Sequence, residues 1–266
     1  LGLVSHQLIA EAAYAASKSP HTANQRALTL KVNDQLETTL KSAAGWHEHL
    51  TACQKRYASL WLTATDVIGN SNHFAAALQL RLRWTPVPDP ETEWACSCNY
   101  TGTPEDIQTH VLGCTRVTGM GPSTRHTRIN MELAKLCRES LLAVSTEPQL
   151  DNKTRLDLQV HFPHGDVYVD VTVANTLAKS KPSETSATAR KLTHYPTAVL
   201  GDKELIVATF EALGGFGVGT MALLKRIAEA SDTPRPDLAR RLAKVLALSN
   251  GAIILASRAR QKRDIL

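Results

Sequence analysis

The sequence predicts an α+β protein in which a helical N-terminal region is followed by a mixed sheet flanked by helices. Residues 1–82 are rich in Ala and Leu with helical periodicity, and residues 154–173 alternate apolar and polar side chains as half-buried strands do. Between these regions lies a compact cluster of cysteine and histidine. We therefore expect a helical region at 1–90, a small metal-binding module at 91–124 and a strand-containing domain at 125–266.

The composition is that of a globular protein with a modest basic excess. The 266 residues are 43% hydrophobic and 21% charged, and the net charge is +5. Such a charge permits a polyanionic partner without requiring one. No apolar run approaches the ~18 residues that a membrane span needs, and five cysteines are an odd number for a disulfide framework. We expect an intracellular chain without a membrane partner, excised from a longer polypeptide because its first residue is Leu.

The helical region ends at a Pro-rich boundary. The stretch "ALQLRLRW", residues 77–84, predicts a last Arg-bearing helix, and "TPVPDPETE" follows it directly. Proline in this number is incompatible with a continuing helix, because each ring removes a backbone N–H and blocks the preceding turn. The domain border is therefore expected near residue 90.

Cysteine and histidine then cluster within "CSCNYTGTPEDIQTHVLGC", residues 96–114. Thr103 as a cap and Pro104 at the first helical position predict a short helix that carries His110 toward Cys114. Three thiolates and one imidazole form a closed tetrahedral shell for a structural zinc ion, with no open position for catalysis. The predicted zinc ligands are Cys96, Cys98, His110 and Cys114. The alternative is that these are unrelated free thiols.

The amphipathic helix predicted over residues 125–143 leads into a hairpin within "TRLDLQVHFPHGDVYVDVTV", residues 154–173. With the turn centred on His164 and Gly165, the carboxylates of Asp157 and Asp170 lie diagonally across one face, where they can reach a single divalent cation. The other reading is a polar, solvent-facing sheet surface without function. The opposite face would hold Leu156, Leu158, Val160, Val167, Val169, Val171 and Val173.

After the hairpin, Ser183 is a predicted helix cap with Glu184 in the first turn. Glu184, Thr188, Lys191 and Tyr195 then fall near one helix face, at spacings of four, three and four residues. The stretch "ELIVATFEALGG", residues 204–215, predicts a third strand. Three helices are expected near residues 218–230, 235–247 and 251–262.

Taken in order, these parts resemble one family. The stretch "SLWLTATDVIGNSNHFAAALQLRLRW" (59–84), the C-x-C, His, Cys cluster, "RH" at Arg125 and His126, and "RLDLQV" followed by "VDVTV" are similar to the restriction-like endonuclease region of site-specific non-LTR (LINE-type) retrotransposon polyproteins. The likeness covers roughly residues 58–225. It implies a helical linker at 1–90, a CCHC-type zinc knuckle at 91–124 and a nuclease domain of the PD-(D/E)xK fold at 125–266.

The resemblance implies a Mg²⁺- or Mn²⁺-dependent endodeoxyribonuclease. Such an enzyme nicks target DNA in the nucleus and frees a 3′-hydroxyl that primes the attached reverse transcriptase, which brings the element RNA; a dimer on the target DNA is compatible with it. The rival expectation is a zinc-stabilised nucleic-acid-binding module with an inactive nuclease fold. The sequence departs from the strict motif, because Leu156 replaces the Pro before the first acid and Thr172 stands at the usual Lys position.

Site residues follow from the resemblance and from the residue chemistry. One or two divalent ions held by Asp157 and Asp170 would activate water and stabilise charge on the phosphate. The family's lysine is displaced onto the following helix, which makes Lys191 its counterpart, with Glu184 and Tyr195 beside it; Glu147 resembles an additional acid. A basic rim suited to backbone phosphates comprises Arg125, Arg128, Arg155, Arg190 and Lys191, the alternative being a solvated face. His126 is expected either to contact phosphate or to cap the nuclease helix.

Overall fold

The computed structural model of the protein describes residues 34, 38, 46–63, 71–83, 94–117, 120–151, 154–178, 183–195 and 200–261. The chain divides into two compact units, Leu1–Cys53 and Gln54–Leu266. Helix α3 (Trp46–Gln54) ends at this boundary. The borders predicted near residues 90 and 124 both fall inside the second unit. Within the described ranges, no helix has the length and apolar character needed to cross a bilayer.

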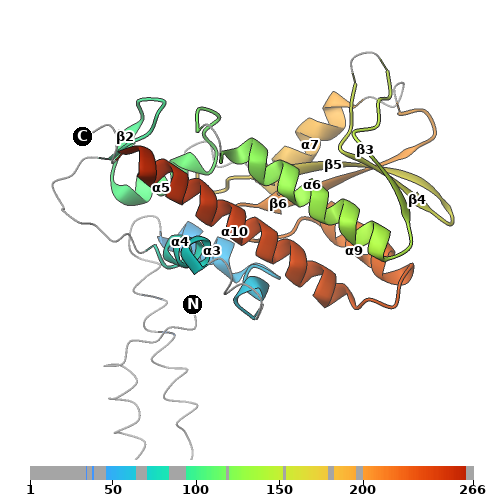
Figure 1. Ribbon diagram of the computed structural model, residues 1–266, viewed down its shortest axis with the longest axis horizontal. Helices are drawn as coiled ribbons and strands as arrows, with labels where there is room; N and C mark the ends of the chain where they lie inside the picture. Colours follow the sequence, from blue (N-terminus) through green and yellow to red (C-terminus); the bar gives the residue numbers. More distant parts are fainter. Residues whose placement is uncertain are drawn as a thin grey trace, which may run out of the picture. The chain divides into compact units, whose positions relative to one another are not determined.

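The second unit is built on a mixed four-stranded sheet in the order β3-β4-β5-β6 (Figure 1). The strands are β3 (Ala143–Thr146), β4 (Leu158–Phe162), β5 (Gly165–Ala174) and β6 (Glu204–Glu211). Pairing is antiparallel between β3 and β4 and between β4 and β5, and parallel between β5 and β6. The predicted α+β class with a mixed sheet is confirmed at this level.

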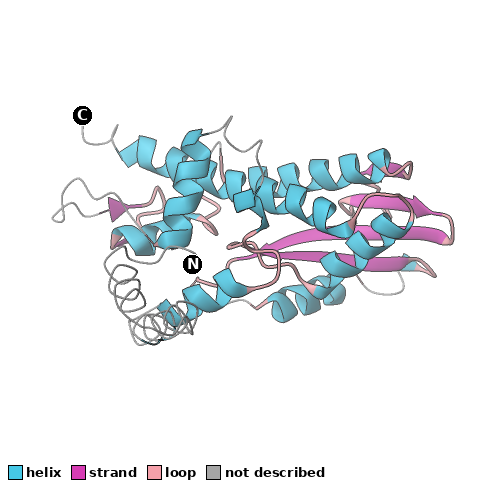
Figure 2. Ribbon diagram, turned by 90° about the horizontal axis from the view of Figure 1, so that it is seen from below, coloured by secondary structure: helices cyan, strands magenta, loops and turns pink. Residues whose placement is uncertain are grey.

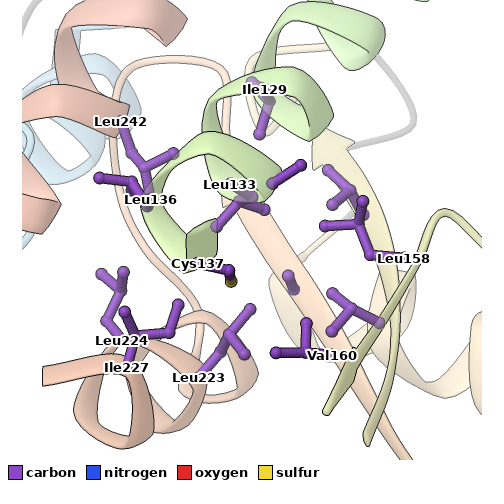
Figure 3. Close-up of a cluster of buried hydrophobic side chains, with 14 of the residues drawn as sticks. Ile129, Leu133, Leu136, Cys137, Leu158, Val160, Leu223, Leu224, Ile227 and Leu242 are labelled. Atoms are coloured by element: carbon purple, nitrogen blue, oxygen red, sulfur yellow. The ribbon is translucent and has the colours of Figure 1, made fainter. Parts of the chain in front are cut away.

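Helices cover both faces of this sheet (Figure 2). On one face lie α6 (Pro122–Glu139) and α9 (Val218–Glu229), with α10 (Arg235–Gln261) packed against both helices. Their apolar side chains meet those of β4, β5 and β6 in the main core, as Figure 3 shows for Leu133, Leu158 and Leu223. On the other face α7 (Glu184–His194) contacts β5 and β6, and its predicted cap is present, since Ser183 accepts a hydrogen bond from the Ser186 N–H.

The remaining elements of this unit lie along α10. The 3₁₀ turn η1 (Leu60–Thr63) and α4 (Ser71–Leu82) both pack against it. A small module follows, in which the short strands β1 (Trp94–Ala95) and β2 (Thr101–Gly102) pair and precede α5 (Pro104–Val111). The Arg-bearing helix predicted to end the helical region near residues 77–84 is thus confirmed as α4, which ends at Leu82.

Strand β3 was not expected, because the sequence pattern placed residues 140–143 at the end of a helix. Helix α6 stops at Glu139, and Leu141 adopts a positive φ of 60° that no α-helix can contain. The strand that follows is an exposed edge strand of four residues. Its residues therefore lack the apolar alternation that identifies half-buried strands.

The hairpin register is two residues away from the predicted one. Phe162 pairs with Gly165, so Pro163 and His164 form a two-residue loop, and Gly165 has a φ of 135° that favours glycine. Extending the observed register by one pair sets Asp157 opposite Asp170, whereas the predicted register sets Asp157 opposite Thr172. Leu156 also departs from the prediction, because it packs with Tyr168 and not in the main core.

Residues 235–261 form one helix, although two had been expected with a break near residue 250. Gly251 is buried inside this helix, and a Cβ atom placed there would lie well inside van der Waals contact with the carbonyl oxygen of His73 in α4. Gly251 therefore does not end the helix. Its missing side chain lets α10 and α4 approach each other closely.

We expect Gly251→Ala to lower the free energy of unfolding by about 2 kcal/mol, because overpacking forces the two helices apart. In an unconstrained helix the same change stabilises by about 1 kcal/mol. Urea unfolding would measure the difference, with Ser257→Ala on the same helix as the neutral control. A gain of stability in Gly251→Ala would contradict the close approach.

Candidate functional site

The side chain of Asp157 takes the place of a strand partner at the start of β4. Its Oδ2 accepts the backbone N–H of Val171 in β5 at 2.6 Å, while its own N–H donates to the Val169 carbonyl at 3.2 Å. His126 of α6 completes this edge, because its Nε2 lies 3.0 Å from the Val171 carbonyl and 3.2 Å from Asp157 Oδ2. The N–H and the C=O of Val171 are thus bonded to side chains, because β4 begins only at Leu158 and offers no backbone partner there.

Asp170 is the residue before Val171, and its side chain is directed to the α7 face of the sheet. It is only 3% exposed. The Tyr195 hydroxyl donates to its Oδ1 at 3.0 Å, and Lys191 Nζ lies 2.9 Å from its Oδ2. The amine forms an ion pair with Oδ2 but does not approach it with hydrogen-bond geometry. Oδ2 is therefore a buried oxygen that accepts no hydrogen bond. A buried carboxylate oxygen left in this state has coordination capacity for a cation.

The two aspartates are close enough for both charges to act on the same neighbours. The hydrogen bond with Asp157 raises the pKa of His126 above its usual value, and the charges of Asp157 and Asp170 both add to this. Burial and the charge of Asp170 raise the pKa of Tyr195, with a contribution from Asp157. The expected shared face is corrected, since Asp157 lies along the sheet edge and contacts His126 of α6, whereas the Asp170 carboxylate contacts Lys191 and Tyr195.

Asp157 is ionised in this arrangement. Burial by itself raises the pKa of Asp157, but the hydrogen bond and charge of His126, together with the Val171 N–H, hold that pKa below its usual range. The neighbouring Asn130 contributes in the same direction. A carboxylate that stays charged while partly buried is suited to bind a divalent cation.

The two further predicted acids do not join the aspartates. Glu147 follows β3, its side chain is 65% exposed, and it pairs with Arg155 at 3.1 Å. Only its backbone approaches the site, through a hydrogen bond from its N–H to the Asp157 carbonyl. Glu184 uses its carboxylate to accept the Val218 N–H at 3.1 Å and so caps the first turn of α9. Both carboxylates serve other contacts.

Arg125 was expected to contact nucleic acid, and this expectation is wrong. This residue of α6 is only 3% exposed, and its guanidinium donates to Asn250 Oδ1 at 2.8 Å and to the Leu112 carbonyl at 2.9 Å. Burial lowers the pKa of Arg125 to about 10, which leaves it charged at neutral pH. Arg125 therefore ties three segments of the chain together and has no exposed group to offer a phosphate.

The other predicted basic residues are spread over different surfaces. Arg128 lies on the side of α6 away from the aspartates, with its Nη2 3.8 Å from the Met120 sulfur. Arg155 is the exposed partner of Glu147, and Arg190 is exposed on α7 next to Lys191. Of the predicted basic residues, Lys191 contacts Asp170 and His126 contacts Asp157. The predicted rim is therefore smaller than the sequence implied.

Asn130 belongs to the site and was not predicted. It lies one helical turn after His126, with its amide nitrogen 3.4 Å from His126 Nδ1, while its buried Oδ1 has no hydrogen-bond partner. The i, i+4 spacing within "RHTRIN" is the sequence signal that could have identified it. The contact orients the imidazole that holds Asp157.

The cysteine cluster has the geometry of a metal site. The ligand atoms of Cys96, Cys98, His110 and Cys114 all lie within 4.8 Å of one another. The sulfurs of Cys96 and Cys114 are 3.7 Å apart, close to the edge of about 3.8 Å in a tetrahedron with zinc–sulfur bonds of ~2.3 Å. Within the described parts of the chain, this is the one group of three or more Cys, His, Asp or Glu side chains that meets so closely.

Local structure brings these four ligands together as the sequence predicted. Thr103 caps α5 in a reciprocal capping box with Asp106, and Pro104 occupies the first turn. The helix carries His110 to within 3.1 Å of the Cys98 sulfur, and Tyr100 stacks on the imidazole ring at 4.2 Å. The hairpin of β1 and β2 presents Cys96 and Cys98 between its strands.

The chemistry of the donors also fits a cation. Burial raises the pKa of the Cys114 thiol to about 11, so this thiol needs a neighbouring positive charge to ionise at neutral pH. Zinc supplies that charge and deprotonates a thiol that coordinates it. The cluster could therefore hold one zinc ion, with the protein closing its coordination shell.

Comparison with protein-family models finds no matching family, and comparison with curated proteins finds no significant match.

Purified protein is expected to retain about one zinc ion per chain by elemental analysis, and Cys98→Ser is expected to lose it together with thermal stability. Cys137→Ser is the matched control, because Cys137 is fully buried in the main core and far along the chain from the cluster. If Cys98→Ser retained as much zinc as the unmodified protein, Cys98 would not be a zinc ligand.

Arg125→Ala is expected to lower the free energy of unfolding by about 3 kcal/mol, because it leaves buried acceptors on Asn250 and Leu112 without their donor. Arg128→Ala, three residues later on the same helix and partly exposed, is expected to cost less than about 1 kcal/mol. Denaturant unfolding of the two variants gives the comparison. Equal, small losses would restore Arg125 as a surface residue.

Proposed function

We propose that this protein is a metal-dependent DNA endonuclease. The observation that supports this most directly is the contact of the Lys191 amine with the buried Asp170 oxygen at 2.9 Å, next to Val171, whose N–H donates to Asp157 at 2.6 Å. Two carboxylates and an amine beside neighbouring residues of one strand are groups that can bind a divalent cation, bind phosphate and position water. The exposed flank of the group lets a nucleic acid backbone approach, since Lys191 is 27% exposed.

Each side chain has a distinct part in this proposal. Asp157 and Asp170 would hold Mg²⁺ or Mn²⁺, which when bound supplies Lewis acidity and lowers the pKa of a coordinated water. Lys191 would orient the attacking water or stabilise charge on the phosphate oxygens. Tyr195 holds the Asp170 carboxylate in place through its hydroxyl, and His126 does the same for Asp157. These last two act as positioning residues.

The biological setting follows from the sequence resemblance. We infer a PD-(D/E)xK nuclease core, a zinc knuckle at residues 91–124 and a helical linker, from the polyprotein of a non-LTR retrotransposon. The nick would prime reverse transcription of the element RNA on nuclear target DNA, with the attached reverse transcriptase and, on the target, a second copy as partners. The order of the motifs along the chain and the mixed sheet with helices on both faces support this inference.

A second candidate is a zinc-stabilised nucleic-acid-binding module whose nuclease site is inactive. One observation favours it: neither Glu147 nor Glu184 is available as a third acidic ligand, because each is engaged elsewhere. Two carboxylates bind a divalent ion more weakly than three. Binding without cleavage would then be the activity of the chain.

A nicking assay on supercoiled plasmid separates the two candidates. With Mg²⁺ or Mn²⁺, the purified protein is expected to convert supercoiled to open-circular DNA, and Asp170→Asn is expected to slow this by at least about a hundredfold. Lys191→Ala is expected to lower the nicking rate about 10²-fold or more, because the amine assists the same hydrolysis step.

Asp166→Asn is the matched control, since it makes the same substitution on the same strand at the hairpin end, where Asp166 contacts His161 and Gln159. This variant should nick as the unmodified protein does. If Asp170→Asn retained full nicking, a contaminating nuclease or another site would be responsible. If the unmodified protein bound DNA without nicking it, the second candidate would hold.

A further inference from the structure

A hollow of about 650 Å³ lies between α4, α6 and α10. Its lining from α6 includes Arg128, Met131, Lys135 and Arg138. At 100° per residue, Arg128 and Lys135 lie on the side of the helix opposite His126 and Asn130. The helices concerned lie next to one another in Figure 1. The hollow is therefore separate from the carboxylate pair and shares no residue with it.

The floor of the hollow is mostly apolar. Ala134, Val245 and Leu248 contribute to it, and Met131 beside them is 66% exposed, which is unusual for so apolar a side chain. Methionine is a flexible and polarisable residue that packs well against flat aromatic groups. The floor therefore has the character of a surface on which a planar ring can lie.

One polar group interrupts this floor. Ser249 of α10 lines the hollow and is only 3% exposed, and its hydroxyl oxygen has no hydrogen-bond partner. An unsatisfied buried hydroxyl costs about 1–3 kcal/mol, so native proteins rarely keep one without a function. Less than 1 Å² of this oxygen is accessible, so a ligand with a polar edge would satisfy it after the side chains that line the hollow shift.

The rim of the hollow is positively charged. Arg128, Lys135 and Arg138 line it from one helix, and His73 lines it from α4. The acidic residue on the rim, Glu132, is neutralised by Arg241 at 2.7 Å. Lys135 also pairs with Glu139 at 3.8 Å, at 62% exposure. Three cations around an apolar floor favour a ligand that joins a flat ring to an anionic group.

We propose that this hollow binds an unpaired nucleotide of a single-stranded nucleic acid. The base would lie on the apolar floor with its polar edge at the Ser249 hydroxyl, and the adjacent phosphates would contact Lys135 and Arg138. A volume of about 650 Å³ is within the range of small-molecule sites and accommodates one nucleotide. A base within a duplex is stacked on both sides and cannot enter, so the site selects a single strand.

Fluorescence anisotropy with labelled oligo(dT), oligo(U) and a DNA duplex of equal length tests this proposal on the full chain. Single strands should bind more tightly than the duplex to the hollow, and the preferred strand identifies the source as DNA or RNA. Lys135→Ala combined with Arg138→Ala should weaken single-strand binding about tenfold or more. Ser249→Ala should weaken it about fivefold, because one hydrogen bond is lost.

Lys225→Ala is the matched control. Lys225 forms an i, i+4 ion pair with Glu229 on α9, as Lys135 does with Glu139 on α6. This control should bind single strands as the unmodified protein does. Unchanged affinity in both Ser249→Ala and the double variant, with unfolding temperatures preserved, would overturn the proposal. So would tighter binding of the duplex than of either single strand.

Discussion

A buried carboxylate is the constraint on which the arrangement of this site depends. Asp170 sits in β5, which has a neighbouring strand on each side, and only 3% of its surface is exposed. Removing such a charge from water costs several kcal/mol unless donors and cations surround it. Lys191 and Tyr195 provide this surrounding from one helix, at a spacing of four residues. The ion pair and the hydrogen bond of Asp170 thereby fix where α7 packs against β5.

The edge of the sheet next to Asp170 is completed by side chains. Because β4 begins only at Leu158, Val171 would have unsatisfied backbone groups there, and Asp157 and His126 supply the missing partners. His126 is held by the helix that Arg125 anchors. Since Arg125 also binds the Leu112 carbonyl just before Cys114, the cysteine cluster and the carboxylate pair are connected through two adjacent residues of α6.

Helix α6 thus presents different chemistry on its different sides. Ile129, Leu133 and Leu136 enter the main core, His126 and Asn130 reach the carboxylate pair, and Lys135 and Arg138 line the basic hollow. In the two proposals, one helix positions the Asp157 carboxylate through His126 and contacts an unpaired strand through Lys135 and Arg138.

Much of this protein could be predicted from the sequence, because capping, turn chemistry and periodicity act over a few residues. The cap at Thr103 and the four Cys and His side chains on either side of it are of this kind, as is the cap at Ser183 that sets Lys191 and Tyr195 on one face. Tertiary structure alone decided the hairpin register, the exposed edge strand β3, the close contact at Gly251 and the burial of Arg125. The register is set by the two-residue loop before Gly165, whereas the other three features depend on partners distant in the chain. A buried charge or a missing side chain has its effect only through the group packed against it.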